Sequence, residues 1–156
     1  MSRIMNDLMS SLGKTLGFPD LCFDPTGYCA LGFDDFLLNM QYIEATEQLF
    51  LSVSVAGLPE GNRQPLYELL LQGNCGFAQT GGATLGVNEE NGVVLSAHIK
   101  VVTLDNLSFE TLIDNFLTIA ESWRERIALM PDAGKAPSAT VRLPRDGFMP
   151  ESLLRI

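Results

Sequence analysis

Histidine, cysteine and basic residues are scarce in this chain, and each shortage argues against a class of function. The 156 residues include one histidine, three cysteines, and 10 Lys and Arg against 19 Asp and Glu, which gives a net charge of -9. Nucleic-acid phosphates require a basic surface and an anionic membrane repels an acidic domain, so we expect neither as a partner. Cys22, Cys29 and Cys75 have no metal-like spacing, so we expect no metal and no other cofactor.

Long apolar runs are also missing. No window reaches the roughly 18 apolar residues of a membrane span, and Asp7 interrupts the N-terminal run, so we expect neither membrane insertion nor a signal peptide. An odd number of cysteines favours free thiols in a reducing cytoplasm. Nevertheless 46% of the residues are hydrophobic and the mean hydropathy is +0.16, which excludes a disordered acidic chain. The composition predicts one acidic domain with surplus apolar surface.

The apolar periodicity predicts three helices, at about 3–16, at about 65–78, and from a Ser108 cap to Pro131. Strand patterns lie at 21–24, 28–33, 37–45, 49–56, 84–88 and 93–102. Turn signals at 24–27 and at Asn91-Gly92 join neighbouring strands closely, which requires antiparallel pairing. We therefore predict an α+β fold in the order α-β-β-β-α-β-β-α, with residues 1–130 as a single domain. The change to Pro, Gly, Ala and basic residues predicts a flexible C-terminal tail at 131–156.

Catalytic groups are few and poorly grouped. His98 alternates onto the same strand face as Ser96 and Lys100, where an exposed structural histidine is the ordinary interpretation. Asp34 and Asp35 are adjacent, so on a strand they would point to opposite faces. We therefore assign no catalytic residue, and a small acidic enzyme using Asp34, Asp35 or His98 stays an alternative of another class.

Four segments carry a resemblance to a known family. They are the end of the first helix, LGFPDLCFD; the strand LFLSVSVAGLP; the segment PLYELLLQGNCGFAQTGGATLGVNEENGVVLSAHI; and the last helix, FETLIDNFLTIAESW. From about Ile4 to Ile127 the chain resembles the class I type III secretion chaperones, the family typified by the Tir chaperone. The resemblance implies three helices around a twisted antiparallel sheet and a homodimer built on the second helix and adjoining strand. The dimer candidates are Leu66, Leu69, Leu70, Leu85 and Val87.

The resemblance also implies a function in the bacterial cytoplasm. Such chaperones bind the N-terminal chaperone-binding region of a secreted effector in extended form, and keep it soluble and secretion-competent without ATP. An extended client can add a strand to a sheet edge and place side chains in apolar pockets. The effector-binding candidates are Ile4, Met5, Leu8, Met9, Leu12, Phe23, Leu31, Phe33 and Leu38, each of which could equally be core. A regulator that sequesters a protein partner of the secretion system is the related alternative.

Overall fold

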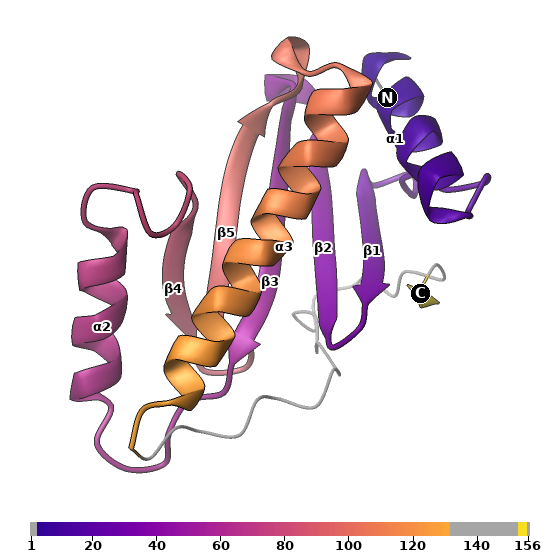
Figure 1. Ribbon diagram of the computed structural model, residues 1–156. Coiled ribbons are helices and arrows are strands. Elements are labelled where there is room, and N and C mark those ends of the chain that lie inside the picture. Colours follow the sequence, from indigo (N-terminus) through magenta and orange to yellow (C-terminus); the bar gives the residue numbers. More distant parts are fainter. Residues whose placement is uncertain (1–2, 132–152, 156) are drawn as a thin grey trace.

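The computed structural model describes residues 3–131 and 153–155, which form three helices beside one sheet (Figure 1). The helices are α1 (Arg3–Leu16), α2 (Gln64–Asn74) and α3 (Asn106–Ala128). The strands are β1 (Tyr28–Phe33), β2 (Phe36–Ile43), β3 (Gln48–Ala56), β4 (Thr84–Asn88), β5 (Gly92–Lys100) and β6 (Leu153–Arg155). Their order across the sheet is β4-β5-β3-β2-β1-β6, antiparallel from β4 to β1 and parallel between β1 and β6. The predicted α+β fold and element order are confirmed for the first five strands.

The core lies between one face of the sheet and α3. In β3 the buried residues Leu49, Leu51, Val53 and Val55 alternate with the half-buried Phe50, Ser52 and Ser54, so one face of the strand packs into the core. Every third or fourth residue of α3 is apolar, and these positions are buried. They are Phe109, Ile113, Phe116, Ala120, Trp123 and Ile127. Figure 1 shows α3 running across the middle of the sheet, with α2 beside β4 and α1 near the opposite side.

Glycine determines how α1 ends. Gly17 has a φ of +81°, and the Phe18 N–H donates to the Gly13 carbonyl at 2.6 Å. A Cβ on Gly13 would lie 2.3 Å from the Phe18 carbonyl oxygen, so only glycine fits the closed end. The Gly13-Lys14-Thr15 run is therefore a helix terminus.

Three local predictions were wrong. Residues 21–24 are not a strand, because the Asp24 carboxylate accepts from the backbone N–H of Thr26 and of Tyr28 at 2.8 and 2.9 Å and so begins a turn. Helix α2 stops at Asn74, before the left-handed residues Gly76 and Phe77. Helix α3 is capped by Asp105, which accepts from the Ser108 N–H at 2.7 Å, so Ser108 is not the cap.

The expected tail at 131–156 is described only in part. Residues 132–152 and 156 lie outside the described residues, and there the tail remains a prediction. Leu153–Arg155 form β6, where the sequence suggested flexible chain. Among the helices of the described chain, none has the length and apolar content needed to cross a membrane.

The contact between α2 and α3 depends on a glycine, Gly73, at the point where Trp123 packs. A Cβ on Gly73 would lie 2.2 Å from Cη2 and 2.4 Å from Cζ2 of Trp123, whose indole N–H donates to the Gln79 carbonyl at 2.9 Å. We expect Gly73→Ala to lower the free energy of unfolding by about 1–2 kcal/mol, because overpacking outweighs the gain in helix propensity. Chemical denaturation measures the change. Gly61→Ala is the matched control, since its Cβ would meet no atom within 4 Å; equal losses in both variants would contradict the packing argument.

The three thiols should differ in reactivity. Cys22 and Cys75 are exposed, whereas Cys29 is buried. Desolvation by burial, with the nearby Cys22 and Asp24 charges, raises the pKa of the Cys29 thiol to about 12. We expect a thiol reagent at neutral pH to modify Cys29 at least about 100-fold more slowly than Cys22, because the thiolate is the reactive form. Peptide mass spectrometry gives the three rates. Unfolding in guanidinium should equalise them, and equal rates in the native protein would contradict the burial of Cys29.

Candidate functional site

The residues considered for catalysis do not come together. Asp34 lies at the β1–β2 turn with a φ of 45°, and Asp35 pairs with Arg124 of α3 at 3.2 Å. His98 lies on β5 with its ring centroid 4.8 Å from that of Phe50, and β3 and β2 separate β5 from β1. Within residues 3–131 and 153–155 no three His, Cys, Asp or Glu side chains gather as a metal site would require. His98 lies far from Asp34 and Asp35 across the sheet, so these three candidates form no nucleophile and base in contact.

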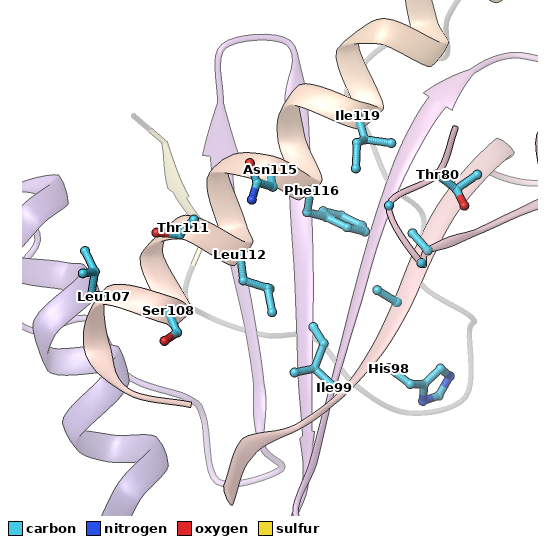
Figure 2. A pocket seen from close by; sticks show the side chains of 14 residues that line it. Thr80, His98, Ile99, Leu107, Ser108, Thr111, Leu112, Asn115, Phe116 and Ile119 are labelled. Carbon is cyan, nitrogen blue, oxygen red and sulfur yellow. The ribbon is translucent and has the colours of Figure 1, made fainter. Parts of the chain in front are cut away.

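An apolar groove of about 640 Å³ lies between α3, β5 and the loop at residues 80–83 (Figure 2). Leu112, Phe116 and Ile119 of α3 line it, with Ile99 of β5 opposite. Figure 2 shows His98 pointing away from these side chains. Its lining residues include no Asp, Glu, Lys or Arg, so apart from His98 at its margin the groove offers apolar contact and hydrogen bonds to uncharged groups.

β1 is the last strand of the antiparallel part of the sheet, and its outer side, where β6 pairs, is the edge at which a strand can be added. Because a two-residue turn joins Phe33 to Phe36, alternate residues of β1 bond to β2 and the others point outward. Tyr28, Ala30 and Gly32 are the outward residues. Asp24 already pairs with Tyr28, since its carboxylate accepts the Tyr28 N–H and its own N–H donates to the Tyr28 carbonyl at 2.8 Å. The backbone groups of Ala30 and Gly32 therefore form the part of this edge that can pair with a strand.

The Asp24 turn keeps its acceptor charged. Desolvation acts to raise the pKa of the Asp24 carboxyl, but hydrogen bonds from Thr26, Tyr28 and Gly27 outweigh it and the pKa is lowered. The Thr26 hydroxyl donates to the same carboxylate oxygen at 2.6 Å. The Asp24 carboxylate stays ionised at neutral pH. Because it occupies Tyr28, the part of the β1 edge that can pair with a strand begins at Ala30.

At the opposite edge of the sheet, a side chain pairs with one residue of β4. The amide of Asn74, the last residue of α2, accepts the Leu85 N–H at 2.9 Å and donates to the Leu85 carbonyl at 2.9 Å. These two bonds occupy the outward backbone groups of Leu85 in the way a neighbouring strand would. Since an unpaired edge is a template for strand addition, Asn74 blocks such addition at Leu85. The two edges of the sheet therefore differ.

The α2–β4 side carries large exposed apolar side chains. Leu71 is 70% exposed, Phe77 61% and Val87 47%. Apolar residues gathered on one side of a molecule commonly mark a protein interface. We refer to these three residues as the α2–β4 surface.

Comparison with protein families gives a direct match. The model of the Tir chaperone protein (CesT) family matches residues 7–124. The chain belongs to this family. No curated protein matches it.

Solved structures that are similar to this chain agree with it in fold. A chain of the crystal structure of the ExsC–ExsE complex is 28% identical with a TM-score of 0.68, and the match covers 81% of this chain and 92% of that one. A chain of the HopA1–SchA chaperone–effector complex is 22% identical, with a TM-score of 0.64 and coverage of 78% and 94%. A chain of the ExoU–SpcU complex from the type III secretion system of Pseudomonas aeruginosa is 16% identical, with a TM-score of 0.56 and coverage of 78% and 93%. The fold is therefore that of the type III secretion chaperones.

The structure places most of the effector-binding candidates inside the chain. Those in the core are Met5, Leu8, Met9, Leu12, Phe23, Leu31 and Leu38. The apolar stripe of α1 is buried because α1 packs on α3 and on the turn at Val101–Thr103. Ile4, at 43% exposed, and the partly buried Phe33 are the two candidates that offer surface to a partner. Contact with an effector stays a prediction for all nine residues.

The dimer candidates divide in a similar way. Leu66, Leu70 and Leu85 belong to the core, Leu69 is partly buried, and Val87 is exposed. The sequence analysis missed Leu71 and Phe77, which are large apolar residues exposed to solvent, as Val87 is. The signal was available, because Leu71 falls outside the stripe formed by Leu66, Leu70 and Gly73 and so leaves an apolar residue on the outer face of α2.

Proposed function

We propose that this member of the Tir chaperone family works in the bacterial cytoplasm as a type III secretion chaperone. It binds the N-terminal chaperone-binding region of an effector in extended form and keeps it soluble and secretion-competent without ATP. Family membership supports this proposal, as does the likeness to a chain of the ExsC–ExsE complex. The observation that carries it is the β1 edge, where Ala30 and Gly32 point backbone groups outward.

The β1 edge suits an unfolded segment better than a folded partner. Strand addition uses main-chain hydrogen bonds, so it accepts an extended client and places few demands on the client's side chains. Ile4 and Phe33 provide apolar surface on α1 and at the end of β1 for alternate client side chains. The net charge of -9 keeps a protein with such surfaces soluble and attracts basic client segments.

Homodimerisation through the α2–β4 surface is part of the proposal. Leu71, Phe77 and Val87 expose apolar area next to the edge that Asn74 closes, so this side favours side-chain packing over strand pairing. The β1 edge lies at the other side of the sheet and stays available in a dimer of this kind. Each chain would then present its own client edge.

Co-purification from the source bacterium tests the function. An affinity-tagged chain is recovered under mild lysis without nucleotide, and its partner is identified by mass spectrometry. We expect a secreted effector, and expect that deleting the N-terminal region of this effector abolishes recovery. His98→Ala and Asp35→Asn should recover the effector as well as the unmodified chain does. A partner that is never secreted would favour the sequestering regulator, and a monomer recovered without any partner chain would contradict the proposal.

A further inference from the structure

We propose that the C-terminal strand β6 is an internal competitor for the client edge. In the client-free chain Leu153–Arg155 pairs with β1 and closes the edge, and a client strand displaces it. This inference rests on the proposed function, because it assigns the same edge to the client. The observation behind it is that the chain places its own C-terminal segment on the part of β1 that can accept a strand.

The register of the β1–β6 pair supports this assignment. Ala30 pairs with Leu153, Leu31 with Leu154 and Gly32 with Arg155, in parallel orientation. In a parallel ladder, a residue bonds to the two residues that flank its register partner. Leu154 is therefore the residue of β6 whose N–H and C=O face Ala30 and Gly32. These are the two residues of β1 that bond neither to β2 nor to Asp24.

The two edges of the sheet are covered in different ways, and only the cover on β1 is a strand that another strand could replace. At β4 the outward groups of Leu85 are held by the Asn74 side chain, which is fixed at the end of α2. At β1 the outward groups are covered by a strand of three residues, the short end of the range for strands. A client strand that pairs with Ala30 and Gly32 and also places apolar side chains on Ile4 and Phe33 adds packing to its ladder bonds, so it can replace β6.

The competition is intramolecular. Because β6 belongs to the same chain, its pairing does not depend on protein concentration, whereas client pairing does. The apparent affinity for the client is then reduced by the fraction of chains in which the edge is open. The benefit is protection, since an uncovered edge would pair with other chains.

Proline substitutions in the full-length chain distinguish the loss of a β1–β6 hydrogen bond from the mere presence of a proline in β6. Leu154→Pro removes the N–H that faces β1, whereas Leu153→Pro removes one that faces away and is the matched control. We expect Leu154→Pro to speed hydrogen exchange of the Gly32 amide at least tenfold. In the Leu153→Pro chain the Gly32 amide should exchange at the rate of the unmodified chain. A labelled peptide of residues 149–156, MPESLLRI, should bind the Leu154→Pro chain at least tenfold more tightly than the unmodified chain. A scrambled peptide is the control.

The readouts distinguish the two proposals. Equal Gly32 exchange in all three chains would overturn the closure by β6. Faster Gly32 exchange in Leu154→Pro, together with equal recovery of effector by Leu154→Pro and the unmodified chain, would overturn the competition. Faster exchange with no effector recovered by any of the chains would overturn the proposed chaperone function and leave the closure intact.

Discussion

A Gly32→Pro chain is expected to lose effector binding by about 30- to 100-fold. The Gly32 N–H points away from β2, so proline removes an outward donor and leaves the β1–β2 ladder in place. The client loses one main-chain bond and buries an unpaired carbonyl, a penalty of about 2–3 kcal/mol in total. Titration of the purified effector segment against each chain measures the loss.

Gly32→Ala is the matched control for this experiment, since it adds a side chain but keeps the N–H. Its affinity should stay within about threefold of the unmodified chain, and its thermal unfolding should match that of Gly32→Pro. Leu154→Pro should change affinity in the opposite direction, because it frees the edge that Gly32→Pro blocks. Equal affinity in Gly32→Pro and Gly32→Ala would remove the β1 edge from the binding mechanism.

A Leu71→Asp chain is expected to be monomeric, with the dissociation constant of the dimer raised by at least about 100-fold. Leu71 is 70% exposed in the single chain and belongs to the α2–β4 surface. A carboxylate buried in an apolar interface lacks a partner, and its desolvation opposes association. Light scattering should then report the 17.0 kDa of one chain.

Two further substitutions on α2 sharpen this test. Gln72→Asp adds the same charge at an exposed neighbouring position, and we expect it to remain dimeric. Leu70→Asp places the charge at a core position that is 4% exposed, so it should unfold the chain. A dimeric Leu71→Asp chain, or an unmodified chain that is already monomeric, would contradict the proposed interface.

The helices and most strands could be predicted because periodicity and turn chemistry act locally. The β4–β5 hairpin follows from Asn91-Gly92, and Gly92 indeed has a φ of +74°. The stripe of α3 is long enough to be unambiguous. By contrast, the local signal predicted the turn at 24–27 but also a strand leading into it, and the strand expected at 21–24 was wrong because the Asp24 carboxylate bonds forward to Tyr28.

The candidate site was harder to predict, because it depends on backbone direction and on partners distant in sequence. The apolar residues of α1 are equally consistent with groove and core until the packing on α3 is known. The outward direction of Ala30 and Gly32 depends on the parity of the β1–β2 turn. The bond from Asn74 to Leu85 joins residues 11 positions apart through a side chain, and the pairing of β6 with β1 joins the two ends of the chain. The amino-acid composition and the local sequence pattern predict neither the outward direction of Ala30 and Gly32 nor these two long-range pairings.

The Asn74 amide has a consequence for stoichiometry. Molecules whose sheets have two open edges can pair edge to edge in an open-ended array. Molecules in which one edge is blocked can pair only through the other edge. With Leu85 occupied by Asn74, strand addition at β4 is disfavoured, and β1 is the edge at which we propose that a strand exchanges. We therefore expect one extended client segment per chain, added at β1.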